Sequence, residues 1–331
     1  MGATPVACGA SKGERWYQKG QNLVLSLRRF AGDLAGAPCA RLAVLPPTSR
    51  SVARMTGLGK AADRKLERRR LAAVGVFGWY RRRRSDALLV SFPECGRSWL
   101  RVMVGRAFQL HFGLPDHTDL SELGRLTELD RRVPGVLVTH DDDAHSKPPA
   151  EVERDKSRYR HRRVVLLVRD PRDVIVSLYH QLSARRDRYH GTLAEFVNQP
   201  VGGFASLLAF YDAWAAALDV PAALLVVRYE DLHARPEAEL AQVLAFLGVA
   251  ATPATVAAAV EYGSFANRRR LEESGRAASD RPRPGRVGHV GTYQTRRGTV
   301  GGFRDELDPH QIAHLDRMMA ASSALVFGYG P

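Results

Sequence analysis

The chain has 331 residues, of which 45% are hydrophobic and 25% charged, a composition typical of globular proteins. Its length is sufficient for one large α/β domain or two smaller ones. It contains three cysteines, with neither a CxxC pair nor a combined Cys/His spacing that suggests a zinc site. These features argue against a disulfide framework and a structural metal, and they favour a cytoplasmic location.

The net charge of +14 comes entirely from the N-terminal part of the chain. Residues 1–85 contain 18 Lys and Arg against 4 Asp and Glu, whereas residues 86–331 contain 31 of each sign. The high isoelectric point, near 10.2, is therefore no reason to expect the main part of the chain to bind nucleic acid. We expect a basic N-terminal extension over residues 1–85 and one α/β domain over residues 86–331.

Within the extension, residues 64–84 (RKLERRRLAAVGVFGWYRRRR) place a short apolar patch between two arginine clusters. One interpretation is a helix or arm that makes weak contact with a membrane surface or another polyanion. The other is a poorly ordered extension, which Gly75 and Gly78 favour because they interrupt the helical pattern. No apolar run approaches the roughly 18 residues of a membrane span.

Four short, uninterrupted apolar runs follow, as in strands that are buried on both faces of a parallel sheet. The predicted strands cover residues 87–92, 135–140, 164–169 and 223–229, and the helical patterns cover residues 99–110, 171–184, 204–218 and 235–247. This alternation predicts a doubly wound, mostly parallel sheet flanked by helices, with a ligand site beyond the carboxyl ends of the strands. Residues 267–290, rich in Arg, Gly, Pro and Ser, are predicted to form a mobile loop.

The first predicted strand leads into a helix through the turn SFPECGRSWL, residues 91–100. Amide groups at the start of a helix favour an anion there. Gly96 permits close approach of the backbone and Ser98 offers a hydroxyl, although many such turns contain Gly and Ser only for packing. The turn lacks the Walker pattern and its lysine, and Glu94 places a negative charge where an anion is expected.

The second junction, residues 164–180 (VVLLVRDPRDVIVSLYH), places Arg169 at a strand end and Ser177 in the helix that follows. An arginine can bind phosphate through two N–H groups, and a serine on the facing helix can add a hydrogen bond. The alternative is a structural ion pair of Arg169 with Asp170 or Asp173.

The third junction, residues 292–307 (TYQTRRGTVGGFRDEL), contains Arg296, Arg297 and Gly298 in a Gly-rich, irregular segment. Two adjacent arginines followed by glycine are suited to a flexible basic clamp over an anionic ligand. The alternative is a solvated turn.

Together, the three junctions resemble the sulfotransferases that use 3′-phosphoadenosine 5′-phosphosulfate (PAPS). The family's first loop reads like YPKSGTTW (FPECGRSW here), its 3′-phosphate motif like RNPKDVAVSYYH (RDPRDVIVSLYH here), and its C-terminal clamp like RKGxxGDWK (RRGTVGGFR here). A segment beginning YEDL after the fourth strand is also similar, so the resemblance extends from residue 88 to about residue 316. It implies the P-loop-like sulfotransferase fold and sulfuryl transfer from PAPS to a small-molecule hydroxyl acceptor, without a metal.

The resemblance also implies roles for residues at matching positions. They are Arg169, Ser177 and Arg296 for the 3′-phosphate, with Arg297 and Gly298 beside them; Trp99 and Phe265 for the adenine; Tyr229 for a further nucleotide contact; and Glu94, Cys95, Gly96, Arg97 and Ser98 for the turn at the 5′-phosphosulfate. The chemistry of these side chains agrees, because cations and hydroxyls suit phosphate and aromatic faces suit a base. By itself, either of the two adenine aromatics would indicate only core packing.

His140 ends the second predicted strand in VLVTHDDDAH and matches the family's motif KTH. A histidine near its ordinary pKa can accept the proton of an attacking hydroxyl, so the resemblance implies that His140 is the catalytic base. The three following aspartates, Asp141 to Asp143, could orient the imidazole or bind a cation. We expect instead a solvated acidic turn.

Two positions depart from the family pattern. Glu94 replaces the turn lysine, and Val138 replaces the lysine two residues before the histidine. Loss of one such donor costs about 3–4 kcal/mol of transition-state stabilisation. We expect Arg97 to supply the missing charge and Glu94 to pair with Arg97 or Arg101. The alternatives are a PAPS- or PAP-binding protein with weak or lost catalysis and a nucleoside or sugar kinase, which the missing Walker lysine disfavours.

Residues 191–214 match the substrate side of the family and contain several Phe and Tyr residues. These side chains are predicted to line an apolar mouth. We therefore expect a lipid, phenolic or natural-product alcohol as acceptor rather than a long anionic glycan. The sequence makes no prediction of oligomeric state.

Overall fold

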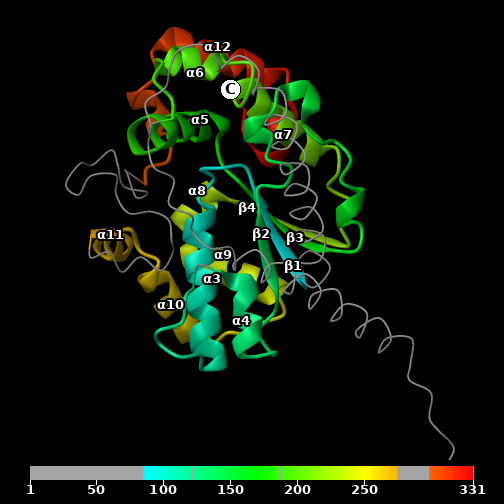
Figure 1. Ribbon diagram of the computed structural model, residues 1–331, viewed down its shortest axis with the longest axis vertical. Helices are drawn as coiled ribbons and strands as arrows, with labels where there is room; N and C mark the ends of the chain where they lie inside the picture. Colours follow the sequence, from blue (N-terminus) through cyan, green and yellow to red (C-terminus); the bar gives the residue numbers. More distant parts are fainter. Residues whose placement is uncertain (1–84, 121, 187, 274–297, 331) are drawn as a thin grey trace, which may run out of the picture. The chain divides into compact units, whose positions relative to one another are not determined.

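The computed structural model describes residues 85–120, 122–186, 188–273 and 298–330 (Figure 1). The basic residues 1–84 and the predicted clamp residues Arg296 and Arg297 lie outside this description. The predicted boundary at residue 85 coincides with the start of the described residues and stays a prediction. In the described part of the chain, no helix has the length and apolar character needed to cross a membrane.

The four apolar runs form one parallel sheet, as the sequence predicts, with the strand order β2-β1-β3-β4 (Figure 1). The strands are β1 (Ala87–Ser91), β2 (Val136–Thr139), β3 (Arg163–Val168) and β4 (Ala223–Arg228). All of β1 and nearly all of β3 are buried, which explains why their sequences are uninterrupted apolar runs rather than alternating ones.

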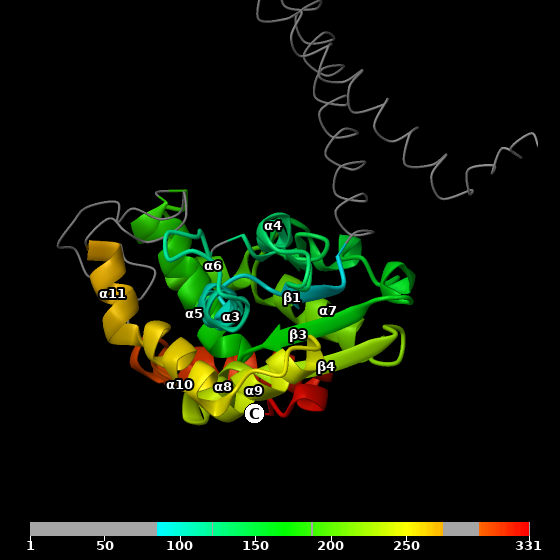
Figure 2. The ribbon, with the colours of Figure 1, turned by 90° about the horizontal axis from the view of Figure 1, so that it is seen from below.

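Helices lie between these strands and after the last of them, and most of the helices pack in two groups. The helices are α3 (Arg97–Phe112), α4 (Leu123–Leu129), α5 (Pro171–His180), α6 (Leu193–Asn198), α7 (Phe204–Ala215), α8 (Tyr229–Ala234), α9 (Pro236–Phe246), α10 (Pro253–Tyr262), α11 (Phe265–Glu273) and α12 (Pro309–Ala320). Helices α3, α9 and α10 pack against one another, and α5, α6, α7 and α12 form the second group. At the two edges of the sheet, α4 packs against β2 and α9 against β4 (Figure 2). The doubly wound α/β fold is confirmed.

Local sequence signals explain the ends of two of these helices. Pro171 is the first residue of α5, and the carboxylate of Asp170 accepts the backbone N–H of Arg172 at 2.9 Å, which caps the helix. Gly248 follows α9 with a left-handed φ of 81°, the conformation that commonly ends a helix at glycine.

The prediction of a mobile loop over residues 267–290 is wrong in its first part. Residues up to Glu273 belong to α11, and the hydroxyl of Ser264 accepts the backbone N–H of Asn267 near the helix start. The segment FANRRRLEE is rich in Arg, Leu and Glu, which favour helix. The Gly and Pro residues that suggested a loop come later, in residues 274–290, outside the described residues.

The parallel register brings the carboxyl ends of all four strands to the same edge of the sheet. His140, Arg169 and Tyr229 each follow directly on the last residue of a strand. Three predicted site residues from distant parts of the sequence therefore leave the sheet at one edge, where open α/β sheets bind their ligands.

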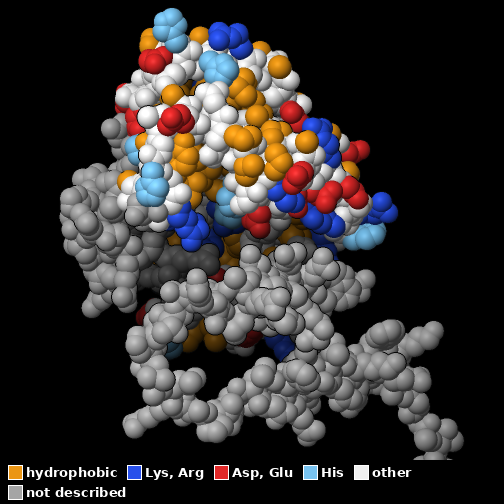
Figure 3. All heavy atoms as spheres, turned by 45° about the horizontal axis from the view of Figure 1, so that its top comes forward, with side chains coloured by type: hydrophobic (Ala, Val, Ile, Leu, Met, Phe, Trp, Pro, Cys, Tyr) orange, Lys and Arg blue, Asp and Glu red, His pale blue; other side chains and the backbone are white. Residues whose placement is uncertain are grey.

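The surface of the described residues carries charges of both signs. On the face shown in Figure 3, basic and acidic side chains are interspersed with hydrophobic ones. This distribution agrees with the equal numbers of acidic and basic residues in positions 86–331.

Candidate active site

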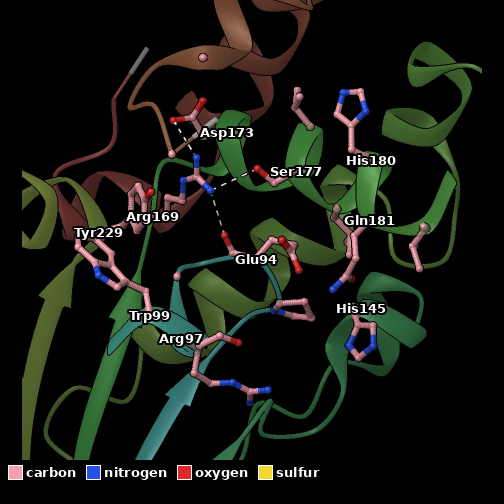
Figure 4. A pocket seen from close by; sticks show the side chains of 18 of the residues that line it. Glu94, Arg97, Trp99, His145, Arg169, Asp173, Ser177, His180, Gln181 and Tyr229 are labelled. Carbon is pink, nitrogen blue, oxygen red and sulfur yellow. Dashed lines mark hydrogen bonds and ion pairs between the residues drawn. The ribbon is translucent and has the colours of Figure 1, made fainter. Parts of the chain in front are cut away.

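A cavity of about 700 Å³ lies beyond the carboxyl ends of the strands (Figure 4). The predicted site residues that line it are Glu94, Gly96, Arg97, Ser98, Trp99, His140, Arg169, Ser177, Tyr229, Phe265 and Gly298. The volume falls in the usual range for a small-molecule site. The structure therefore brings together nearly all of the described residues that the sequence singled out.

Cys95 is the exception. Its side chain is buried in the core and does not line the cavity, and its thiol lies 3.9 Å from the carbonyl oxygen of Pro93. Burial raises the pKa of Cys95 to about 12, so the group stays a neutral thiol. The Cys95 side chain therefore belongs to the core, and a contact of this residue with the nucleotide stays a prediction.

The turn after β1 is shaped by two residues with left-handed backbone. Gly96 has φ 91° and Glu94 has φ 65°. A Cβ atom added to Gly96 would lie 2.5 Å from Cδ2 of Tyr229, so only glycine lets the turn approach this ring. Helix α3 begins directly after Gly96, and the positive end of its dipole opens into the cavity.

Arg169 joins the turn after β1 to helix α5 (Figure 4). Its Nη1 atom donates to the hydroxyl of Ser177 at 3.2 Å and to the backbone carbonyl of Glu94 at 3.1 Å. The guanidinium lies over the ring of Tyr229, 4.3 Å from its centroid. The proposed alternative pairing with Asp170 is not found, since that carboxylate binds a different arginine.

Asp173 fixes the C-terminal segment over the start of α5. Its carboxylate accepts the backbone N–H groups of Gly301 at 2.8 Å and Phe303 at 3.0 Å, and it pairs with Arg169 at 3.6 Å. Arg169 also donates to the carbonyl of Thr299 at 3.3 Å. Sequence reasoning treated a position beside Ser177 and an ion pair with Asp173 as alternatives for Arg169. The structure shows both. Sequence reasoning missed the anchoring role of Asp173, for which its place in the first turn of α5 was the only signal.

His140 is held as a neutral imidazole with a defined tautomer. Its Nδ1 lies 3.0 Å from the carbonyl of Ser91, so Nδ1 carries the proton and donates it. Its Nε2 lies 2.6 Å from Nη2 of Arg97, which can only donate, so Nε2 accepts. Burial and the charge of Arg97 lower the pKa of His140 to about 3.

Arg97 is the cation that is hydrogen-bonded to His140. Burial and the neighbouring Arg101 lower its pKa to about 10, which still leaves it charged at neutral pH. The carboxylates of Glu94 and Asp143 act on it in the opposite direction. The predicted replacement for the turn lysine therefore lies in the cavity, hydrogen-bonded to the predicted base.

The expectation of a solvated acidic turn after His140 is wrong for Asp141. The Asp141 side chain has no exposed surface and pairs with the equally buried Lys156 at 2.8 Å, as well as with Arg158 and the Tyr159 hydroxyl. Burial alone would raise the pKa of Asp141, but the charges of Arg158 and Lys156 outweigh it and lower the pKa. Asp141 therefore anchors the loop that carries His140. The backbone of Asp141 itself has a left-handed φ of 60°.

Replacing Asp141 with alanine should lower the free energy of unfolding by about 3–5 kcal/mol, because the substitution leaves Lys156 buried without its partner. Equilibrium urea unfolding measures this loss. The matched control is Asp116→Ala, which removes a fully exposed carboxylate and should change stability by less than about 0.5 kcal/mol. Equal stabilities of the two variants would contradict the anchoring role.

Four further residues line the cavity, and we call this group the acceptor side; they are His145, Gln181, Arg186 and Arg188. Gln181 begins one turn of π-helix (η5, Gln181–Arg185) that continues α5. A periodic sequence signal cannot reveal such an insertion, and π-turns are frequent at functional sites. Sequence reasoning missed these four residues, although the run ARRDRYH, residues 184–190, was a signal for the arginines.

The predicted apolar mouth is not found. The aromatic side chains of residues 191–214 on which it rested lie in the core and do not line the cavity; they are Phe196, Phe204, Phe210, Tyr211 and Trp214. Each of them is at most 2% exposed. The apolar pattern of α6 and α7 thus reflects packing in the core rather than contact with a ligand.

Comparison with known proteins identifies relatives of this chain. A family model described as "Sulfotransferase domain" matches residues 84–326. Sulfotransferase 6B1 of Pan troglodytes is 24% identical over 246 residues, which cover 71% of this chain and 75% of that protein. Sulfotransferase 4A1 of Mus musculus is 26% identical over 196 residues, 54% of this chain and 66% of that protein. The crystal structure of retinol dehydratase in complex with androsterone and inactive cofactor PAP superposes with a TM-score of 0.50 at 17% identity, covering 71% of this chain and 80% of that chain, and it shows the shared fold.

Proposed function

The chain belongs to the sulfotransferase domain family, and from this we propose that it transfers the sulfuryl group of PAPS to the hydroxyl of a small-molecule acceptor, with adenosine 3′,5′-bisphosphate (PAP) as the second product. The observation that carries the proposal is the convergence of Arg169, Ser177, Arg97 and His140 on one cavity at the strand ends. Cations and a neutral histidine in one cavity are the groups that transfer of a charged sulfuryl group requires.

The nucleotide would bind on the side of the cavity formed by Trp99, Arg169, Ser177 and Tyr229, which we call the nucleotide side. Arg169 and Ser177 would hold the 3′-phosphate, and Trp99 with Phe265 would enclose the adenine. The residues fit a nucleotide, since the turn approaches Tyr229 so closely that no Cβ can be accommodated at Gly96 and the N-terminus of α3 opens to the cavity. The predicted clamp residues Arg296 and Arg297 belong to the same proposal, on the strength of the resemblance.

His140 would take the proton from the acceptor hydroxyl at Nε2 while the acceptor oxygen forms its bond to sulfur. The bond from sulfur to the phosphate oxygen breaks in the same displacement, and negative charge builds up on the departing PAP. Nη2 of Arg97 donates a hydrogen bond to Nε2 of His140 at 2.6 Å. Arg97 must therefore move away from the imidazole before Nε2 can accept the proton. A shift of Arg97 to the transferring group would release the base and supply the cation that Glu94 cannot.

Two measurements test the proposal. Calorimetric titration with PAP should show binding at a single site. Incubation with ³⁵S-labelled PAPS and a broad panel of hydroxyl compounds should yield labelled product. Absence of PAP binding would overturn the proposal.

The second candidate is a protein that binds PAPS or PAP but transfers little. The observation that favours it is the resting arrangement itself, in which Glu94 lines the cavity and Arg97 blocks Nε2 of His140. The variant Glu94→Lys discriminates between the two functions. A large gain in transfer over an inactive parent supports the binding protein, whereas clear activity in the unaltered protein excludes it.

Replacing Gly96 with alanine should weaken PAP binding at least tenfold, because the added methyl group meets Tyr229 at 2.5 Å and the turn must shift. The matched control is Gly113→Ala at the end of α3, which also has a left-handed φ, 69°, but has no atom within 4 Å of the added methyl group. Both variants should lose about 1 kcal/mol of stability from backbone strain. Only Gly96→Ala should lose affinity in the calorimetric titration, and equal PAP affinity in the two variants would contradict the role of the turn.

A further inference from the structure

The acceptor side of the cavity is rich in cationic and polar groups. Figure 4 shows His145 and Gln181 across the cavity from Trp99 and Tyr229, with Glu94 between them. Arg186 and Arg188 line the cavity from the segment that follows η5. The acceptor is therefore expected to meet charged and hydrogen-bonding groups on this side.

The charge of Arg186 reaches the reacting part of the site. Arg186 lowers the pKa values of both His140 and His145, although burial contributes more to each shift. One carboxylate, Asp143, acts on His145 in the opposite direction. Among the described residues near His145, two arginines thus stand against the carboxylate of Asp143, with Glu94 between the two sides of the cavity.

The polar groups on this side have unused binding capacity. In the described part of the chain, no carboxylate pairs with the guanidinium groups of Arg186 or Arg188. The buried Nδ1 of His145 also has no hydrogen-bond partner in the described structure. Its ring lies 5.7 Å from that of His140, centroid to centroid, so these groups lie beside the base. Unpaired guanidinium groups next to a reaction centre are suited to an anion, which they can bind through paired N–H groups.

We propose that the acceptor is an alcohol or phenol that also carries a carboxylate, which Arg186 and Arg188 bind while the hydroxyl reaches Nε2 of His140. This inference rests on the proposed sulfuryl transfer and narrows its substrate class. It replaces the apolar acceptor expected from the sequence, since the aromatic side chains behind that expectation are buried in the core. Leu182, half-buried in the cavity wall, offers apolar contact to the carbon skeleton between the two polar groups.

The test compares hydroxy acids with their methyl esters. The panel holds 4-hydroxybenzoate, 3-(4-hydroxyphenyl)propionate and 12-hydroxydodecanoate, each with its methyl ester, so that the members of a pair differ in the charge and in one methyl group. The full-length protein is assayed with PAPS for transfer, and its PAP complex is titrated with each compound. We expect at least one acid to exceed its ester about tenfold in kcat/KM or affinity, and the preference to shrink with added salt.

The double variant Arg186→Ala/Arg188→Ala should abolish the preference for the acid and leave the ester unaffected. The control is Arg131→Ala/Arg317→Ala, which removes the same charge from exposed positions that do not line the cavity. PAP affinity should be unchanged in both double variants. If the unaltered protein does not bind PAP, the proposed function itself is refuted. This result differs from a failure of the carboxylate proposal, in which PAP still binds.

The remaining outcomes count against the proposal. If PAP binds and every ester equals or exceeds its acid, the acceptor side does not select a carboxylate. The same holds if no acid binds the PAP complex. A preference that survives removal of both arginines would also overturn the assignment, because it would place the anion elsewhere.

Discussion

The variant His140→Ala is expected to lose about a hundred- to ten-thousandfold in kcat, with little change in PAP affinity. General base catalysis contributes a factor of this size, and His140 is not among the residues that form the nucleotide side of the cavity. Steady-state transfer kinetics and calorimetric titration with PAP separate the two effects. The control His161→Ala alters an exposed histidine outside the cavity and should be neutral.

The pH dependence gives an independent check on the same residue. A base with a lowered pKa is in its active, deprotonated form above that pKa, and its activity falls only as the pH drops through it. With a pKa near 3 in the free protein, His140 predicts no acid limb in kcat/KM for PAPS between pH 5 and 8. If Arg97 leaves the imidazole when PAPS binds, the pKa rises, so an acid limb should appear at higher pH in kcat than in kcat/KM. An acid limb near pH 6.5 in kcat/KM would contradict the observed environment of His140.

The second large effect is expected for Arg97→Met, which should lower kcat about a hundred- to a thousandfold, the loss typical of one donor to the transition state. Methionine keeps much of the length and removes the charge. Arg97→Lys should restore part of the rate, because it returns a cation without the planar fork. An unaltered kcat in Arg97→Met would show that another group supplies the charge.

Arg97→Met has a further consequence that a purely structural role would not produce. Removing the guanidinium takes away one of the two main causes of the low pKa of His140, so that pKa should rise. Titration of the histidine ring by NMR in the protein without nucleotide measures the rise. The contact between Arg97 and His140 thereby becomes testable without turnover.

Much of the fold could be predicted because burial on both faces of a parallel sheet requires uninterrupted apolar runs. Their positions also placed His140, Arg169 and Tyr229 correctly at one edge of the sheet. The turn around Gly96 followed from the strand and helix that flank it. These signals depend on residues that are close together in the chain, so they can be recognised in a single sequence.

The parts that escaped prediction depend on contacts between distant residues. Arg97 and His140 are 43 positions apart, and no pattern in either segment predicts a hydrogen bond between their side chains. Asp141 was expected in solvent because its neighbours are acidic, whereas its partner Lys156 lies in a separate loop. The direction of the Cys95 side chain likewise depends on how the turn sits above the core.

The fate of the aromatic residues in α6 and α7 shows a second limit. An apolar helix face gives the same sequence pattern whether it packs on a core or lines a cavity. Only the structure shows that Trp214 and its neighbours are fully buried, and that the cavity wall comes instead from the π-turn after α5. For the arginines of the acceptor side, the run ARRDRYH was the signal in the sequence.

The strand order β2-β1-β3-β4 has a consequence for how such a protein can change. His140 follows β2 and Arg169 follows β3, with β1 between them, so two interstrand spacings of roughly 5 Å each separate the two chain segments. The sheet therefore fixes the distance between the chain segments that carry these two residues. On the proposed function, substitutions in the loop after β2 and in the turn after α5 would change which acceptor binds, without changing this distance or the contacts with the nucleotide.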